Sequence, residues 1–339
     1  MVSYPFLSAS QLLRLASISE KIGFGIALVS NITLLLLLLY KSNAKFGTYK
    51  HLMISYTLIE MMYSITGTTS NVGAHISDDS YVIFRHYYGP NRTIGPLFIL
   101  QYCTMVFSLL LILAVHFIYR FCATCSTNLL SLFNGYRLLI WVFGSLAAGA
   151  FSAFVKYIFL GENDYTTEKL RPIFLEEYGL TMEQIVYNGP TFYICDNDNN
   201  CHMSLKDLLT MTYIYIALFS CFFLMTVFGL KTYLKLHGNS RIISQKTCQV
   251  QKQLLFALII QTVIPIIFVY IPSAVLFGLP IFNIRIGAYA NLVMVCLAIY
   301  PPLDQIAIIY IIRDFRDALK GSLCGFHQNK TKMSQATLS

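Results

Sequence analysis

The sequence predicts an all-α membrane protein, a bundle of seven transmembrane helices. Hydrophobic residues make up 56% of the chain and charged residues only 12%, whereas a soluble domain would carry about twice that share of charge. The apolar residues gather in seven runs of about 20 to 25 residues, each long enough to cross ~30 Å of hydrocarbon. Lys and Arg concentrate in alternate connections, as they do in multi-pass membrane proteins.

The least apolar of these runs is the second, which contains many Ser and Thr residues together with Glu60. Such a helix needs protein neighbours, which favours a packed bundle over separate anchors. We expect three parts, namely an extracellular N-terminus (1–21), a transmembrane domain (22–312) and a cytoplasmic helix with a tail (313–339). The predicted spans are 22–40, 52–73, 96–119, 138–160, 208–230, 254–279 and 287–312.

The basic residues predict the orientation. The connections 41–51, 120–137 and 231–253 and the segment 313–339 together contain fifteen Lys and Arg residues, against eight in the opposite set. Positive charge collects on the cytoplasmic side, so the N-terminus is expected outside and the C-terminus inside. The sequon that begins at Asn91 then falls in an outside connection and predicts glycosylation there.

Three polar residues share one predicted depth in the membrane. Asn31, Glu60 and Asp304 each lie about ten residues from a cytoplasmic helix end, ~14 Å into the bilayer. Polar groups inside a bilayer are costly, so each is a functional candidate. They predict a polar layer with a water or a cation between the two acids. The alternative is that each residue only bonds to a neighbouring helix.

Prolines interrupt the last two spans. Pro265 and Pro272 lie two turns apart in the sixth span, and Pro301 and Pro302 are adjacent in the seventh. Proline removes a backbone hydrogen bond and kinks a helix, which a membrane helix tolerates when neighbours satisfy the freed carbonyls. We expect hinges at Pro265, Pro301 and Pro302. Static kinks that serve only packing are the alternative.

Cysteines predict one crosslink and one lipid anchor. Cys195 and Cys201 lie in an outside connection, where an oxidising compartment favours a local disulfide. Cys103, near the outer end of the third span, is a competing partner. After the seventh span, apolar residues at four-residue spacing predict a helix lying on the inner leaflet. Cys324 at its end is a candidate for palmitoylation.

Signatures of enzymes are missing from the sequence. Histidines are scattered, with no metal-ligand pair, and neither a glycine-rich phosphate loop nor a nucleophile elbow is present. We therefore expect no enzymatic activity, metal or cofactor. The net charge of +8 is best explained by topology, so nucleic acid is not an expected partner.

Four strings together resemble one family. They are FGTYKHLM (46–53), VHFIYRFCATC (115–125), QKQLLFALIIQTVIPIIFVYIPSAVLF (251–277) and YPPLDQIAIIYIIRDFR (300–316). They are similar to the nematode serpentine chemoreceptors of the Str class, the group that includes the nematode diacetyl odorant receptor, and the resemblance is collinear over nearly the whole chain. It implies a seven-helix G-protein-coupled receptor in the plasma membrane of sensory cilia on chemosensory neurons.

The resemblance also implies a switch at Tyr119 and Arg120. They occupy the place where other receptors of the wider superfamily keep an acid–Arg–Tyr sequence, although here the acid is absent. On spacing alone, Arg120 would instead reach lipid headgroups at the interface. A heterotrimeric G protein is the implied partner of this region. The basic residues expected to contribute are Lys231, Arg241, Lys246 and Arg313, and the basic connection suits anionic lipid equally well.

We expect a small, weakly polar odorant or metabolite to bind among the outer halves of the third, fifth, sixth and seventh spans. The acidic connection 161–205 is expected to cover this pocket. The candidate lining residues are Tyr102, Met105, Tyr213, Tyr215, Tyr270 and Asn291, and plain helix packing is the alternative for each. A ligand-gated channel or a transporter with Glu60 and Asp304 along an ion path is the competing function.

Overall fold

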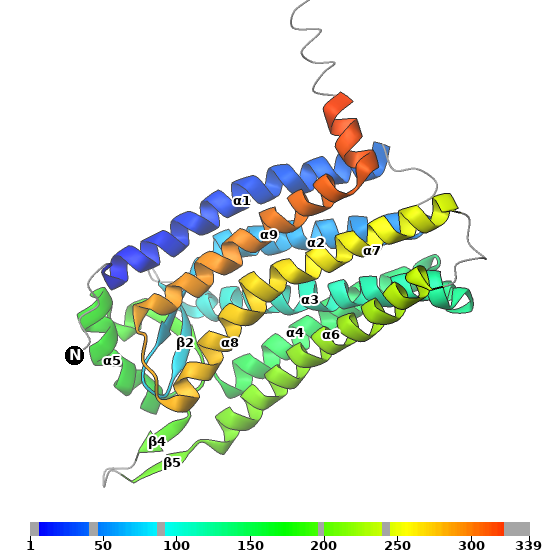
Figure 1. The fold of residues 1–339 in the computed structure, drawn as a ribbon. Helices are drawn as coiled ribbons and strands as arrows, with labels where there is room; N and C mark the ends of the chain where they lie inside the picture. Colours follow the sequence, from blue (N-terminus) through cyan, green and yellow to red (C-terminus); the bar gives the residue numbers. More distant parts are fainter. Residues whose placement is uncertain (1–6, 41–46, 87–91, 196–199, 239–244, 322–339) are drawn as a thin grey trace, which may run out of the picture.

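Seven long helical crossings form the body of the protein, as the sequence predicts. They are α1 (Ala9–Tyr40), α2 (Tyr49–Ser70), α3 (Gly95–Cys125), α4 (Tyr136–Phe159), α6 (Leu205–His237), α7 (Gln245–Pro265) continued by α8 (Ile271–Gly278), and α9 (Asn291–Ile311). The computed structural model describes residues 7–40, 47–86, 92–195, 200–238 and 245–321. Figure 1 shows a bundle that is covered at one end by short strands and a further helix, α5 (Asp164–Tyr178). The orientation of the bundle in the membrane stays a prediction.

Within the described residues, six crossings are long and apolar enough to span a membrane, and α2 is not among them. It nevertheless lies inside the bundle, in contact with α1, α3 and α9. Its hydroxyl groups bond within the helix, since Thr57, Ser64 and Thr66 donate to carbonyl oxygens three or four residues earlier. This internal bonding removes the cost of burying hydroxyls in an apolar environment.

The first helix is longer than expected. It begins at Ala9, so residues 9–21 are helical although the sequence analysis assigned them to the extracellular N-terminus. Its buried residues Leu12, Ala16 and Glu20 continue the face of the membrane-spanning part at four-residue spacing. The polar residues on its other positions lower the hydropathy of this segment, which explains the missed turns.

Within the described part of the chain, five short strands add β-structure to the predicted all-α fold. The strands β1 (Val72–Ile76), β2 (Tyr81–His86) and β3 (Ile185–Asn188) form an antiparallel sheet in the order β1-β2-β3. The strands β4 (Tyr193–Cys195) and β5 (Cys201–Met203) pair as a separate hairpin. We call β1 to β5 and α5 together the cap.

The cap has a small core of its own. The helix α5 packs on the sheet through Leu170 and Phe174, which contact Phe84 and Ile185. The rings of Phe84 and Phe174 meet edge to face with centroids 4.9 Å apart. The helix starts at the Asn163 side chain, which accepts a hydrogen bond from a backbone N–H of the first turn. The long polar connection 161–205 is thus largely an ordered element on top of the sheet.

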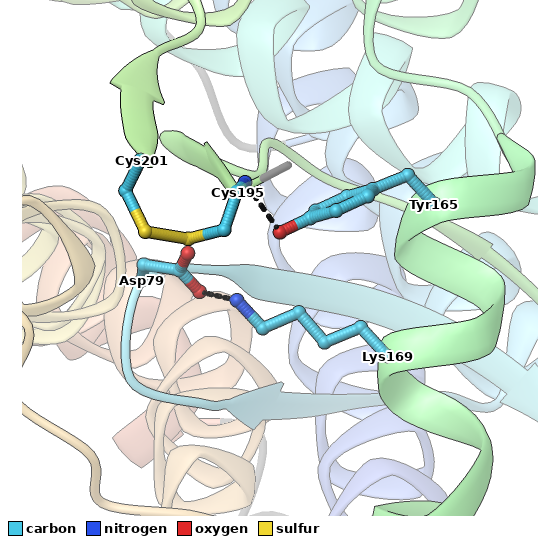
Figure 2. Close-up of a disulfide and its surroundings, with 5 residues drawn as sticks. All are labelled: Asp79, Tyr165, Lys169, Cys195 and Cys201. Atoms are coloured by element: carbon cyan, nitrogen blue, oxygen red, sulfur yellow. Dashed lines mark hydrogen bonds and ion pairs between the residues drawn. A yellow bond between two sulfur atoms is a disulfide. The ribbon is translucent and has the colours of Figure 1, made fainter. Parts of the chain in front are cut away.

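A disulfide closes the β4–β5 hairpin (Figure 2). Cys195 and Cys201 are bonded to each other, and the backbone N–H of Cys195 donates to the Tyr165 hydroxyl of α5 at 2.9 Å. Beside it, Asp79 from the β1–β2 turn pairs with Lys169 of α5. The predicted competitor, Cys103, is a buried free thiol in α3.

A helical segment follows α9 at the end of the bundle opposite the cap (Figure 1). Residues 313–321 are helical, with Phe315 fully buried, Leu319 half-buried and Arg313 exposed. This arrangement agrees with the predicted amphipathic helix. The predicted palmitoylation site, Cys324, lies outside the described residues. We call this end of the bundle the tail end.

Candidate functional site

A largely apolar cavity of about 210 Å³ lies inside the bundle near the cap. Side chains from β2, α3, α4, α6, the turn between α7 and α8, α8 and α9 form its wall. Three of the predicted lining residues, Tyr102, Tyr215 and Tyr270, are among them. The arrangement suits a small molecule with a mostly apolar body, because aromatic walls with few polar groups are typical of small-molecule sites.

Three other predicted lining residues do not reach this wall, which corrects the sequence prediction. Tyr213 points to α4, where its hydroxyl lies 3.2 Å from that of Ser152. It is two positions from Tyr215, so the two side chains leave the helix on opposite sides. Met105 is buried against other helices. Asn291 has a structural role, because its Oδ1 accepts from the backbone N–H of Ala74 at 3.0 Å and so ties β1 to α9.

The cap end of the cavity is formed by β2 rather than by the acidic connection. Tyr81 and Ile83 of this strand line the cavity, and no described residue of the connection 161–205 does. The Tyr81 ring lies 4.9 Å from that of Phe277, and its hydroxyl contacts Met211 Sδ at 3.5 Å. The expectation that 161–205 covers the pocket directly is therefore wrong. In the sequence, the only sign of β2 is an apolar run between two polar turns.

The sixth crossing changes its helical geometry where it borders the cavity. After Pro265 comes η5 (Ile266–Tyr270), a π-helical turn in which the N–H of Ile271 donates to the carbonyl of Ile266. Val269 and Tyr270, both in this turn, line the cavity. Single π turns inside α-helices are frequent at functional sites. The predicted hinge at Pro265 thus lies directly beside the candidate site.

Hydrogen bonds around Asp304 connect three crossings between the cavity and the tail end. Its Oδ2 accepts from the Tyr56 hydroxyl of α2 at 2.8 Å and from Gln261 Nε2 of α7 at 3.1 Å. The Tyr56 hydroxyl also lies 3.0 Å from that of Tyr300. We call Tyr56, Gln261, Tyr300 and Asp304 the Asp304 cluster. A carboxylate with two donors from two other helices fixes how these helices meet.

The predicted polar layer is only partly present. Asn31, Glu60 and Asp304 are all fully buried, yet within the described residues no hydrogen bond joins any two of them. Asn31 donates to the carbonyl of Ala27 in its own helix at 2.8 Å. Asn31 Oδ1, both carboxylate oxygens of Glu60 and Asp304 Oδ1 find no hydrogen-bond partner among the described protein groups. Depth along a helix was predictable from sequence, but the direction of each side chain was not.

The two prolines of α9 leave carbonyls that other helices cover. Pro301 frees the carbonyl of Leu297, which accepts from the Tyr63 hydroxyl at 3.0 Å. The oxygen of Ala298, freed by Pro302, faces Gly23 of α1, and a Cβ at Gly23 would lie 2.4 Å from it. Only glycine allows α1 and α9 to approach this closely. The helix α9 continues through both prolines.

Arg120 is buried between α3 and α7 rather than exposed at the membrane interface. Its Nη2 donates to the backbone carbonyl of Gln251 at 3.0 Å, and its guanidinium carbon lies 5.1 Å from the centre of the Tyr49 ring. The ring of Tyr119 stacks on the same tyrosine at 5.2 Å. The third and sixth crossings, α3 and α7, are therefore linked at the tail end, and no described acidic residue forms an ion pair with Arg120.

Comparison with known proteins identifies the family. The family model described as "Serpentine type 7TM GPCR chemoreceptor Str" matches residues 16–320. The chain belongs to the Str family. It is 32% identical to serpentine receptor class r-10 of Caenorhabditis elegans over 92% of both chains. It is 31% identical to serpentine receptor class r-10 of Caenorhabditis briggsae over 96% of this chain and 95% of the relative.

A further relative of this Str receptor is G-protein coupled receptor str-217 of Caenorhabditis elegans, 27% identical over 90% of this chain and 89% of the relative. The protein is therefore a multi-pass membrane protein of a chemoreceptor family, and its relatives are receptors rather than enzymes.

The structure describes some of the remaining predicted residues of the Str receptor and not others. Lys231 is exposed on α6, with its Nζ 5.8 Å from the centre of the Phe121 ring. Lys246 lies in α7, where only the backbone is described. Arg241 and Asn91 lie outside the described residues.

A buried histidine, His75 of β1, was not predicted to matter. Its Nδ1 lies 3.2 Å from the Tyr178 hydroxyl and 3.8 Å from Glu177, which pairs with Arg285 at 2.6 Å. Burial, and secondarily the charge of Arg285, lower the pKa of His75 to about 3. The cap therefore contains a neutral imidazole at physiological pH.

Proposed function

We propose that the receptor detects a small odorant or metabolite in the cavity and activates a heterotrimeric G protein at the tail end. The cap faces outward and the tail end faces the cytoplasm, in the plasma membrane of sensory cilia. The observation that carries the proposal is the continuity of the sixth crossing. One helical rod supplies Tyr270 to the cavity wall and the Gln251 carbonyl to Arg120.

The proposed mechanism is a shift between two arrangements of this rod. Tyr270 and Gln251 are nineteen positions apart, which is ~28 Å along a helix. A ligand that packs better against a displaced η5 favours a state in which the Arg120–Gln251 bond is broken. Ligand binding shifts the equilibrium only by its difference in affinity for the two states. Arg120 and Tyr119 then become available to the G protein.

The G-protein surface includes basic residues at the tail end. Lys231, Arg241, Lys246 and Arg313 give this surface a positive charge, which complements an acidic partner surface or anionic lipid. In the same proposed orientation, Asn91 is glycosylated on the outer side and Cys324 is palmitoylated on the cytoplasmic side.

The test is expression with a promiscuous Gα subunit and a calcium readout for a panel of volatile and water-soluble compounds. Arg120→Ala is expected to abolish the response while leaving surface expression intact. Arg137→Ala, which removes an exposed arginine of α4, is the matched control and is expected to respond normally. An Arg120→Ala receptor that signals at full strength would contradict the proposed switch.

The same cells separate the receptor from a ligand-gated channel or a transporter. An N-terminal tag that antibodies reach without permeabilisation supports the proposed orientation. A ligand-evoked current that persists when G-protein signalling is blocked would instead favour an ion path past Glu60 and Asp304.

A further inference from the structure

Lys156 is the only Lys or Arg in the seven predicted spans. In the structure it lies near the cap end of α4, and 4% of its surface is exposed. An ionisable residue inside a membrane protein is expensive and usually serves a function. The proposed switch does not use Lys156, so its position needs a separate explanation.

The contacts of the Lys156 amine are weak. Its Nζ lies 3.8 Å from the Cys103 sulfur and 5.7 Å from the centre of the Tyr81 ring. A thiol and an aromatic face are poor substitutes for a carboxylate. Within the part of the chain that the structure describes, no carboxylate lies within ion-pair distance of Lys156.

The acids closest to this region have other partners. Glu162 lines a second cavity together with Lys156, but its Oε2 pairs with Arg92 at 2.7 Å and its Oε1 accepts from a backbone N–H. Asp79, two positions before Tyr81, pairs with Lys169. Glu162 and Asp79 are thus paired with other basic residues, and Lys156 has no counter-ion among the described residues.

Lys156 belongs to the wall of the ligand cavity. It lines that cavity and also the second one, of about 320 Å³, between α3, α4 and β3, and Cys103 lines both as well. The rest of the inner wall is apolar or aromatic apart from the Cys103 thiol and the Ser273 hydroxyl, and the hydroxyls of Tyr102 and Tyr270 there have no hydrogen-bond partner among the described groups. Among the described residues, the cavity wall therefore offers one cation, at its cap end, and a mostly apolar interior.

We propose that the ligand is a small carboxylate whose anionic group pairs with Lys156 while its apolar body fills the cavity. This inference rests on the proposed function only in taking the cavity as the ligand site. A carboxylate supplies the missing counter-charge and accepts charge-assisted hydrogen bonds. A neutral ligand of the same shape leaves the ammonium unpaired and is discriminated against. A doubly charged group would need a second cation, which the lining does not contain.

The test is ligand binding to the purified full-length receptor, followed by thermal unfolding. The probes are hexanoate, octanoate, benzoate and phenylacetate, each compared with its methyl ester. We expect at least one acid to bind about tenfold or more tightly than its ester, the factor typical of one charge-assisted contact. Lys156→Met is expected to bring the acid-to-ester ratio close to one, and Lys156→Arg to retain the preference.

The matched control is Lys206→Met, which removes an exposed lysine at the cap end of α6 and is expected to leave the ratio unchanged. The inference is overturned if no acid binds, if the wild-type receptor binds esters as tightly as acids, or if Lys156→Met keeps the acid preference. Because the wild-type comparison needs no variant, a Lys156→Met protein that fails to fold does not rescue the inference.

Nucleotide exchange on the Gα subunit separates this inference from the proposed function. Selective acid binding without any exchange would contradict the proposed G-protein activation and support the role of Lys156. Exchange driven only by neutral compounds would support the proposed G-protein activation and contradict the role of Lys156.

Discussion

In the cap, Asp79 pairs with Lys169 and Glu177 pairs with Arg285, whereas inside the bundle Glu60 and Asp304 keep carboxylate oxygens without protein partners. These two ion pairs of the cap form although their side chains are partly exposed to water. The bundle buries its acids completely and bonds them only in part. The two regions thus differ in whether these carboxylates are paired with a cation, although His75 Nε2 and Asn188 Oδ1 of the cap also find no partner among the described groups.

This difference indicates where the molecule is fixed and where it can change. A fully bonded network has one good arrangement, because every displacement breaks a contact. A buried group that lacks a partner is already costly, by about 1–3 kcal/mol, so another arrangement can have a similar free energy. We therefore expect the ion-paired part of the cap to be the more rigid region, and the interior around Asp304 to have two states.

Among the substitutions, the largest effect is expected from breaking an ion pair of the cap. Asp79→Leu leaves Lys169 without its partner, and we expect the free energy of unfolding to fall by about 3 kcal/mol. The value is at the low end for a buried pair because Lys169 is 28% exposed and can turn toward water. Thermal unfolding in detergent measures the effect. Asp78→Leu, at the adjacent exposed acid, is the control and should change little.

The same type of substitution in the bundle is expected to act in the opposite direction. Glu60→Leu removes a buried carboxylate whose two oxygens have no partner, and we expect the free energy of unfolding to rise by about 2 kcal/mol. The ligand response should fall, because the substitution favours one state. Glu60→Gln separates the loss of charge from the change in shape. A Glu60→Leu receptor that unfolds at a lower temperature would refute the contrast between the two regions.

Acidification is expected to weaken the cap through His75. Its folded-state pKa of about 3 lies below the usual value of 6.5, so unfolding takes up a proton between these two values. Stability should therefore fall as the pH drops below 6.5, by about 1.4 kcal/mol per pH unit. His75→Gln is expected to reduce this slope, and His237→Gln, at an exposed histidine, is not. Equal slopes for the wild type and His75→Gln would show that the imidazole is not buried.

The smallest effect is expected from the disulfide at the edge of the cap. It links residues only six positions apart, so it restricts the unfolded chain little. Replacing both Cys195 and Cys201 with serine should lower the free energy of unfolding by about 1 kcal/mol. A reducing agent should lower the melting temperature of the wild type and leave that of the double variant unchanged. A loss as large as that of Asp79→Leu would mean that the hairpin supports the whole cap.

Six of the crossings were predictable because each is a continuous apolar run, and the length of such a run is a local property of the chain; α2, the exception, is less apolar. The cap was not predictable, because its sheet joins β2 to β3, strands that lie about a hundred positions apart. Its strands are also buried on both faces, so they show no alternation of polar and apolar residues.

Within the site, the sequence predicts the type of each residue and its depth in the membrane, but not the direction in which its side chain points. It selected both Tyr213 and Tyr215, although only Tyr215 faces the cavity. It placed Asp304 correctly among buried polar groups but paired it with Asn31 and Glu60, whereas Tyr56 and Gln261 hold it. The rotation of each helix depends on tertiary packing, which a single sequence does not specify.

The π turn at Ile266–Tyr270 also sets the rotational phase of the sixth crossing. An α-helix advances about 100° per residue, and a π turn holds one residue more than an α turn. The outer segment is therefore rotated by roughly that angle relative to an uninterrupted α-helix, and this rotation brings Ser273 and Phe277 to the cavity. If the turn relaxed to α-helical spacing, the same side chains would point toward lipid or a neighbouring helix. If the cavity binds the proposed ligand, its fit depends on the rotation of this helix segment about its axis, and not only on the width of the space between helices.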